Sequence, residues 1–323
     1  MNILISSAGR RVSLVRAFKK ELNKCFADSK VLTVDYKPEL SPACRDSDGY
    51  FQVPRVTDPL YVSKIIEICT ANNIKIVIPT IDIELIMLAE NIATLKEKGI
   101  IPIISSIDVI SMCRDKRKTH EYFDSIGFPR AMDIDPENPH FPIFVKPFDG
   151  SSSIGVNTIE NKSQLSDSLI NNRQMMFLEY LSPKLYVEFT IDLYFDKNHY
   201  LKCAVPRERI EIRTGEVSKG VTRKTDLYKL VCSKFSYCPG FIGCITLQVF
   251  KNRLSDEIFG IEINPRFGGG YPLSYLAKAN FPEMIIKEYL FNEEIPFFDN
   301  WVENLLMLRF DDEILVYDYK GDK

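Results

Sequence analysis

The first hundred residues alternate apolar runs with segments of helical periodicity, and this alternation constrains the fold more than any other feature. The predicted strands cover residues 2–6, 31–34, 76–78 and 100–104. Apolar residues at helical spacing mark residues 11–24 and a second helix through Leu85, Leu88, Ile92 and Leu95, which Gly99 closes. Strands that alternate with helices form a parallel sheet covered on both faces. The sequence therefore predicts an N-terminal, doubly wound, Rossmann-like α/β domain over residues 1–106.

The loops of this domain hold candidate ligand groups. Residues 6–11 join the first strand to the first helix, where backbone N–H groups with Arg10 and Arg11 could bind an anion. Solvation of the helix start by the two arginines is an equal alternative. The loop lacks the GxGxxG pattern, and a lone Asp35 after the second strand is weak evidence for a dinucleotide. At the third strand end, Glu84 is a candidate ligand contact and Asp82 a helix cap.

Composition sets limits on the class of protein. The net charge of −3 gives no general case for a nucleic-acid surface. The eight cysteines include no CxxC pair, which favours reduced core residues and a reducing cytoplasm. No signal peptide is apparent, and no apolar run reaches the roughly 18 residues of a membrane span. We therefore expect a cytoplasmic protein that binds neither nucleic acid nor membrane.

Three oxygen-bearing side chains are predicted to meet on a hairpin near residue 260. Glu262 and Asn264 are two positions apart in an apolar run, so on a strand both face one side. Gln248 lies on an earlier apolar run, and a turn-rich segment separates the two. Folded back, Gln248 can lie beside Glu262 and Asn264. Such a set suits Mg²⁺, which is held by few protein oxygens together with substrate phosphates.

A lysine and a loop of small residues precede this hairpin. Lys146 ends a short apolar strand at 141–147, where a buried ammonium is costly unless it meets a negative partner. The Gly/Ser loop at 150–155 follows, and its backbone N–H groups and hydroxyls can approach a phosphate. A flexible turn is the common alternative for such a loop. The downstream carboxamide and carboxylate groups favour the phosphate interpretation.

The charged segment 206–220 leaves two interpretations open. It is a solvated hairpin, or it is a substrate-closing loop whose arginines, Arg213 among them, grip phosphate or carboxylate. The glycines at 268–270 can let a substrate approach the backbone closely. The three histidines, at 120, 140 and 199, lie outside every motif, and we expect surface or turn positions for them.

In their order, these motifs resemble the ATP-grasp superfamily, in particular its carbamoyl-phosphate-synthase-like branch. The motifs that carry the resemblance are Lys116, residues 145–147, residues 150–156, residues 178–181, Glu188, Gln248, Glu262, Asn264 and Arg266. The resemblance covers essentially the whole chain. It implies a pre-ATP-grasp domain at 1–106 and an ATP-grasp fold with a small subdomain at 107–183 and a large subdomain at 184–323.

The resemblance also implies a role for each site residue. The implied nucleotide contacts are Lys116, Lys146, Ser151, Ser152, Ser153, Gly155, Glu179, Tyr180, Leu181 and Glu188. Among them, Glu179 to Leu181 form the hinge that reads adenine, and Glu188 binds the ribose hydroxyls. Gln248, Glu262 and Asn264 hold Mg²⁺, with Mn²⁺ as the alternative metal. The implied catalytic residues are Arg266, Lys146 and Arg213.

The sequence after Arg266 departs from the synthases, and the chain is far shorter than their large subunit. We therefore expect a free-standing ATP-dependent carboxylate–amine ligase that forms an acyl-phosphate and acts on small, amino-acid-like carboxylates and amines. A homodimer is common for such enzymes. The alternatives are an ATP-binding regulatory protein without turnover and, less favoured, a dinucleotide-dependent oxidoreductase.

Overall fold

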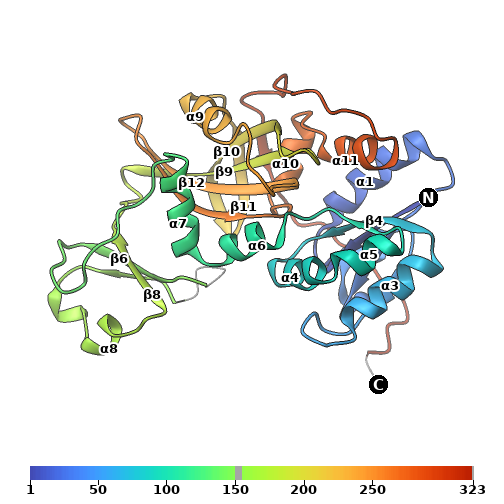
Figure 1. Cartoon of the computed structure of the whole chain (residues 1–323), viewed down its shortest axis with the longest axis horizontal. Helices are drawn as coiled ribbons and strands as arrows, with labels where there is room; N and C mark the ends of the chain where they lie inside the picture. The colour runs from blue at the N-terminus through green and yellow to red at the C-terminus, as the bar shows by residue number, and fades with distance from the viewer. Residues whose placement is uncertain (150–154, 322–323) are drawn as a thin grey trace. The chain divides into compact units, whose positions relative to one another are not determined.

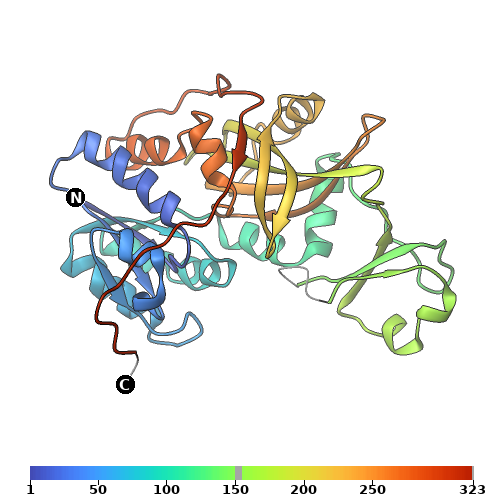
Figure 2. The ribbon, with the colours of Figure 1, turned by 180° about the vertical axis from the view of Figure 1, so that it is seen from behind.

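A computed structural model describes residues 1–149 and 155–321, which form two compact units. The first unit contains Met1–Ile103, Pro282–Glu293 and Leu308–Lys323, and the second contains Ile104–Phe281 and Glu294–Met307. These units are defined by packing, and the division into three domains at 1–106, 107–183 and 184–323 stays a prediction. Figure 1 labels the elements, and Figure 2 presents them from behind.

The first unit is built on a five-stranded parallel sheet of order β3-β2-β1-β4-β5. Its strands are β1 (Asn2–Ser6), β2 (Val31–Asp35), β3 (Tyr50–Gln52), β4 (Ile74–Pro79) and β5 (Ile101–Pro102). β1, β2 and β4 are almost wholly buried, as expected for strands covered by helices on both faces. The predicted strand at 100–104 is shortened to two residues, and Pro102 within it has no N–H to donate to a ladder.

Helices α1–α5 and α11 belong to this unit. Their bounds are α1 (Val12–Cys25), η1 (Pro38–Leu40), α2 (Pro42–Asp46), α3 (Tyr61–Ala71), α4 (Asp82–Glu90), α5 (Ile92–Glu97) and α11 (Phe281–Leu290). The single helix predicted through Leu85 and Leu95 is divided at Asn91, whose side chain donates to the Met87 carbonyl at 2.9 Å. Gly99 follows α5 with φ +69°, as predicted for a cap. α11 lies beside α1 in Figure 1, where Phe26 and Phe291 stack at 5.3 Å.

The loop after β1 is closed by contacts within the unit. The Gly9 N–H donates to Asp35 Oδ2 at 3.0 Å, and the Lys37 N–H donates to Asp35 Oδ1 at 3.2 Å. Asp35 therefore holds two neighbouring turns. Glu84 is fully buried and accepts a 2.5 Å hydrogen bond from the Tyr61 hydroxyl, while burial raises the pKa of its carboxyl. Glu84 Oε2 has no hydrogen-bond partner among the described residues, and the ligand role of Glu84 stays a prediction.

The second unit contains a small antiparallel sheet of order β7-β6-β8. Its elements are β6 (Ile143–Pro147), β7 (Asn157–Ile159), η2 (Lys162–Gln164), α8 (Asp167–Ile170) and β8 (Met175–Glu179). One face packs into a cluster of Ile143, Val145, Ile159 and Phe177. The other face carries Lys146, next to the buried Met176 and Leu178.

The larger sheet of the second unit has the order β13-β12-β9-β10-β11-β14. Its strands are β9 (Tyr186–Phe195), β10 (Leu201–Arg213), β11 (Glu216–Thr222), β12 (Gly243–Asn252), β13 (Ile258–Asn264) and β14 (Leu306–Leu308). The segment 206–220 thus forms part of a hairpin of two long strands, visible in yellow in Figure 2. β9 is central and buried over most of its length, so it is not the half-exposed strand that period-two alternation favours.

Four helices complete the second unit in the described sequence. They are α6 (Ile107–Arg114), α7 (Lys116–Ser125), α9 (Asp226–Lys234) and α10 (Tyr271–Leu276). Ser106 caps α6 and Asp115 caps α7, which fixes the break between these two helices. α7 packs against β13 through Phe123, whose ring would collide with any side chain at Gly260. This packing places the first turn of α7 beside the metal hairpin predicted from the sequence.

The predicted order of parts is found: a doubly wound α/β domain precedes a three-stranded and a six-stranded sheet in the described sequence. Across residues 1–149 and 155–321, the structure has no helix with the length and apolarity needed to cross a membrane.

Candidate active site

The hairpin of β12 and β13 brings the predicted metal ligands together. Gln248 pairs opposite Glu262, and Thr246 pairs opposite Asn264, so all four side chains share one face. The Asn264 amide donates to Glu262 Oε1 at 3.0 Å. This bond leaves Asn264 Oδ1 and Glu262 Oε2 available as oxygen ligands for a metal ion. The donor set fits a divalent cation of the magnesium type, which prefers oxygen ligands.

Lys116 faces this hairpin from the start of α7. Its Nζ lies 3.9 Å from Glu262 Oε2, and its side chain is 11% exposed. The position is fixed by the backbone, because the Lys116 N–H donates to the Phe148 carbonyl at 2.9 Å. Arg117 strengthens the same connection, with its guanidinium 3.6 Å above the Phe148 ring while it pairs with Asp115. Lys116 is therefore held where a negative ligand could meet both its ammonium and a metal ion.

Lys146 faces the same region from β6, on the small sheet. The side chain is 6% exposed, and burial lowers the pKa of its ammonium to about 8. Glu262 opposes this shift and Lys116 adds to it, which places all three groups within electrostatic range. Asp133, a further carboxylate, also opposes the shift. The two ammonium groups suit the phosphates of a triphosphate, and the oxygen ligands on the hairpin suit its metal ion.

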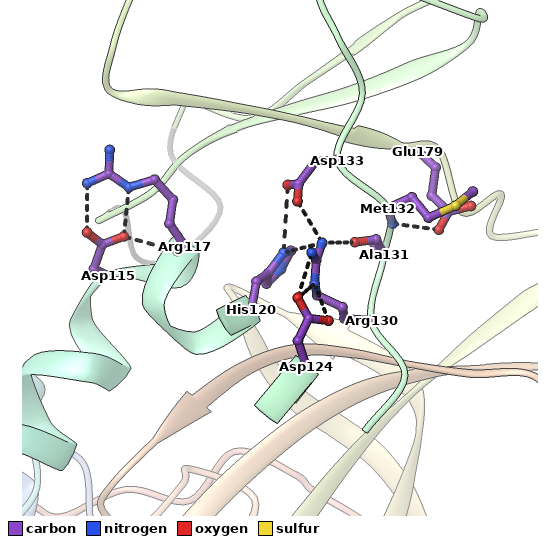
Figure 3. A network of polar contacts seen from close by, with 9 residues as sticks. All are labelled: Asp115, Arg117, His120, Asp124, Arg130, Ala131, Met132, Asp133 and Glu179. Atoms are coloured by element: carbon purple, nitrogen blue, oxygen red, sulfur yellow. Dashed lines mark hydrogen bonds and ion pairs between the residues drawn. The ribbon is translucent and has the colours of Figure 1, made fainter. Parts of the chain in front are cut away.

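The predicted hinge lies where β8 ends. Glu179 closes the strand, and its Oε1 accepts from the Met132 N–H at 2.8 Å while its own N–H donates to the Met132 carbonyl. Figure 3 shows the contact of the Glu179 side chain with Met132 beside the polar network of α7. Tyr180 and Leu181 follow in irregular, half-buried chain. The side chain of Glu179 is thus used to hold the segment that links α7 to the small sheet.

Glu188 lies on β9 and forms an ion pair with Arg209 of β10. Burial raises the pKa of the Glu188 carboxyl even though Arg209 opposes the shift. Arg209 also donates to the Gly215 carbonyl at 3.1 Å, next to the turn between β10 and β11. A ribose ligand would share Glu188 with this arginine. The ribose role of Glu188 therefore stays a prediction.

The two predicted catalytic arginines occupy different places. Arg266 lies two residues after the end of β13, and its N–H donates to the Asn264 carbonyl at 2.8 Å, so it adjoins the metal hairpin. Arg213 is the last residue of β10 and is exposed at the hairpin turn. Arg266 thus adjoins the oxygen ligands, and the catalytic role of Arg213 at the hairpin turn stays a prediction.

Ser151, Ser152 and Ser153 lie outside the described residues. Gly155, the next predicted contact, has φ +76°, a conformation that side chains rarely adopt. A Cβ at this position would lie 3.1 Å from Pro147 Cγ, so the chain passes close to the end of β6. Gly155 therefore lies close to the strand that carries Lys146.

The glycines at 268–270 make room for side chains of the protein itself. A Cβ on Gly270 would lie 2.2 Å from Arg207 Nη1, and one on Gly269 would lie 2.6 Å from Glu216. Arg207 is 1% exposed and forms a bidentate pair with Asp192 at 2.7 and 2.9 Å. The expectation that the glycines admit a substrate is therefore wrong for Gly269 and Gly270. Sequence reasoning missed this pair, although the period-two pattern that put Asp192 on the polar face was a signal.

His120 is the other residue that sequence reasoning misplaced. His140 is exposed and His199 lies in a turn at φ +71°, as expected. His120, however, is 3% exposed on α7, where it faces Arg130 and lies near Lys146. Its position four residues after Lys116 was the available signal, because residues at that spacing share a helix face.

Comparison with known protein families agrees with this geometry. Residues 3–104 match the PylC-like N-terminal domain, and residues 171–303 match the family described as ATP-grasp in the biosynthetic pathway with Ter operon. The chain is similar to the 3-methyl-D-ornithine–L-lysine ligase of Methanosarcina acetivorans, with 32% identity over 268 residues, 81% of this chain and 68% of that protein.

Two further similar proteins match different shares of the chain. The ligase of the same name from Methanosarcina mazei is 33% identical over 141 residues, which are 44% of this chain and 35% of that protein. The chain thus spans part of the length of these relatives. In fold it resembles N5-carboxyaminoimidazole synthetase from Staphylococcus aureus, with a TM-score of 0.70 at 18% identity, over 95% of this chain and 81% of that chain.

The fold and the matched families define an ATP-grasp protein. More narrowly, the chain belongs to the family of ATP-grasp carboxylate–amine ligases that carry a PylC-like N-terminal domain. Members of this superfamily use ATP and a divalent metal ion, and one similar structure is a biotin carboxylase domain in complex with MgADP.

Proposed function

We propose that this chain catalyses the ATP- and Mg²⁺-dependent coupling of a carboxylate to an amine, with release of ADP and phosphate. The observation that carries the proposal is the meeting of Lys116 and Lys146 with Glu262 on the metal hairpin. Two cations and an oxygen-ligand set on facing elements suit phosphoryl transfer, which depends on positioning and charge neutralisation.

The proposed roles follow the position of each residue. Lys116 and Lys146 hold the phosphates, and Gln248, Glu262 and Asn264 hold the metal ion, which would neutralise charge on the transferred phosphoryl group. Arg266 adjoins this set and stabilises the phosphoryl group or the acyl-phosphate. The remaining proposed contacts are Ser151, Ser152, Ser153 and Gly155 over the phosphates, Glu179, Tyr180 and Leu181 at adenine, Glu188 at ribose and Arg213 at the acceptor substrate.

The reaction then has two steps. A substrate carboxylate oxygen attacks the γ-phosphorus, the bond to the β-phosphate oxygen breaks, and ADP leaves. The amine nitrogen next attacks the acyl carbon, phosphate departs with the carboxylate oxygen that had bonded to phosphorus, and the amine loses a proton. Neither step uses a side-chain nucleophile. The lysines, the metal ion and Arg266 neutralise charge that develops on oxygen atoms.

We propose amino-acid-like substrates on both sides of the reaction. The support is the similarity to ligases named for 3-methyl-D-ornithine and L-lysine, at 32% identity over most of this chain. Substrate choice depends on pocket shape, so the particular pair is left to experiment.

The test is a screen for ADP release over pairs of amino-acid carboxylates and amines, with each partner alone as the control. The proposal predicts ADP release that requires both partners, together with a product heavier than either. An ATP-binding regulatory protein would bind nucleotide and release no ADP with any pair. That result, obtained with protein that demonstrably binds Mg²⁺–ATP, would contradict the proposal.

A further inference from the structure

His120 is buried beside the proposed phosphate lysines, although no motif contains it. It lies on α7 one turn after Lys116, and residues at this spacing share one face of a helix. The side chain is 3% exposed. Lys146 lies close enough that its ammonium lowers the pKa of the imidazole, while burial contributes the larger part of the shift. The imidazole therefore lies near both proposed phosphate lysines.

Arg130 determines which ring nitrogen carries the proton. Its Nη1 lies 3.4 Å from His120 Nδ1, and a guanidinium can only donate hydrogen bonds. Asp133 Oδ1 also faces Nδ1, but at 4.0 Å it is too far to accept a hydrogen bond from it. We therefore assign Nδ1 as the acceptor. Burial, Lys146 and Arg130 hold the pKa of His120 at about 4, against the weaker effect of Asp133 and Asp124, so the ring is neutral at pH 7. The single ring proton consequently lies on Nε2.

The Arg130 side chain is itself firmly held. It forms hydrogen bonds with Asp124 at 2.9–3.1 Å, with Asp133 at 2.8 Å and with the Ala131 carbonyl at 3.0 Å. Figure 3 shows Arg130 between the two aspartates with the His120 ring beside it. The tautomer of His120 thus follows from a network that α7 and the segment after it maintain together.

His120 Nε2 is buried and has no hydrogen-bond partner among the described residues. A buried N–H without an acceptor costs about 1–3 kcal/mol. Buried polar groups are normally paired, so an exception of this kind calls for a ligand or a functional reason. The neighbouring ammonium of Lys146 cannot accept a hydrogen bond. An anionic oxygen is the acceptor that both groups would favour.

We propose that His120 is a further nucleotide-binding residue, whose Nε2–H donates to a phosphate oxygen of the bound nucleotide alongside Lys146. This inference rests on the proposed function for the identity of the ligand. It assigns a contact to α7 that the motif resemblance does not contain. In the protein without nucleotide, the unpaired Nε2–H lowers the stability of the fold, and a bound anion would supply the missing acceptor.

Two matched substitutions separate the two ring nitrogens. In His120→Asn, the amide oxygen can still accept from Arg130 and the donor at the Nε2 position is lost. In His120→Gln, an amide N–H can occupy the Nε2 position. The measurement is calorimetric affinity for a non-hydrolysable ATP analogue with Mg²⁺, with adenosine as the ligand that lacks phosphate.

The inference predicts a loss of affinity of about tenfold or more in His120→Asn, since hydrogen bonds to charged groups contribute about 1.5–3 kcal/mol. His120→Gln should remain within about threefold of the wild type, and adenosine should bind both variants as it binds the wild type. Unfolding without nucleotide should show His120→Asn at least as stable as His120→Gln, because no orphan donor remains at that position.

A second measurement uses the wild-type protein and does not depend on how the variants fold. Nitrogen-15 NMR of the three histidines should find His120 as the Nε2–H tautomer at pH 7, and the analogue should shift that resonance. An Nδ1–H tautomer, an Nε2–H resonance that the analogue leaves unmoved, or equal analogue affinity in wild type and His120→Asn would overturn the inference. Equal losses for adenosine would overturn the phosphate assignment. Failure of the wild type to bind nucleotide would overturn the proposed function as well, whereas binding without ADP release would contradict that function alone.

Discussion

Two clusters of buried charged groups lie in the second unit, and they differ in how many of their polar atoms have hydrogen-bond partners. In the first, Asp192 receives two hydrogen bonds from Arg207 and one from the Ser274 hydroxyl at 2.6 Å, all wholly buried. In the second, Lys146 and His120 are buried, and Lys116 Nζ lies 3.9 Å from Glu262 Oε2. The first cluster is complete within the protein, whereas the second leaves His120 Nε2 without a hydrogen-bond partner among the described residues.

The difference separates a packing role from a binding role. A complete ion pair holds its strands together, and breaking it leaves an uncompensated charge. An incomplete cluster costs stability until a ligand supplies the missing acceptor atoms. On this basis, mutations in the Asp192 cluster should lower the free energy of unfolding. Mutations in the Lys146 cluster should weaken nucleotide binding.

The largest effect is expected for Asp192→Ala. Removing this carboxylate leaves the Arg207 guanidinium buried without its partner, which costs about 3–5 kcal/mol in the free energy of unfolding. Asp256→Ala on the β12–β13 hairpin is the control, because that side chain is 86% exposed and its loss should cost less than about 0.5 kcal/mol. Chemical denaturation of the two variants measures the contrast. Equal stability in both would show that the Arg207 pair is not a packing element.

Glu262→Gln should act on turnover rather than on the fold. The substitution keeps the shape and removes the charge that faces Lys116 and the proposed metal ion. We expect ADP release to fall by about 10²–10³, the range seen when one electrostatic stabiliser of a transition state is removed. Denaturation should show little change in stability. Turnover near the wild-type rate would remove Glu262 from the metal set.

Lys146→Met should stabilise the protein without nucleotide and weaken nucleotide binding. A folded-state pKa of about 8 against an ordinary 10.5 corresponds to about 3 kcal/mol of destabilisation wherever both states are protonated, below pH 8. As pH rises from 8 to 10.5, the unfolded chain keeps a proton that the folded chain has lost, so wild-type stability should rise. The gain from Lys146→Met should therefore shrink across this window in denaturation measured at several pH values. A gain that does not vary with pH would show that the Lys146 pKa is not depressed.

Gly270→Ala should give the smallest effect of the series. Gly270 has φ −89°, which alanine adopts readily, so the cost comes from contact alone. Its Cβ would meet Arg207 Nη1 at 2.2 Å and Val217 Cγ1 at 2.7 Å. Overpacking of this kind costs about 1–3 kcal/mol. Unchanged stability in thermal unfolding would show that the glycine is not needed for the Arg207 pair.

The sequence predicts the parts of the fold that depend on local pattern. Period-two spacing placed Glu262 and Asn264 on one strand face, and the turn-rich segment before them predicted the hairpin with Gln248. Apolar runs separated by helical segments predicted the parallel sheet of the first unit. In each case the signal comes from neighbours along the chain, and a buried face enforces the register.

The parts that the sequence did not reveal depend on contacts between distant segments. α7 carries Lys, Arg, His and Glu on most of its surface, so only the four-residue spacing from Lys116 marks the face on which His120 lies. Its burial results from packing against β13 and the network of Arg130. In the same way, Asp192 pairs with Arg207, which lies fifteen residues later on the neighbouring strand. Only this pairing leaves no room for a side chain at Gly270. The break at Asn91 is a local exception, because it arises from a side-chain bond within the helical segment that apolar spacing does not encode.

The central claim is that the chain activates a carboxylate as an acyl-phosphate at the Lys116–Lys146–Glu262 cluster. The most direct measurement uses a carboxylate that the enzyme converts, labelled with ¹⁸O at both carboxylate oxygens. The phosphate released in the reaction is then analysed by mass spectrometry. Because the carboxylate oxygen that attacks phosphorus leaves with it, the account predicts one ¹⁸O atom in each phosphate. Unlabelled phosphate released in step with the amide product would contradict it.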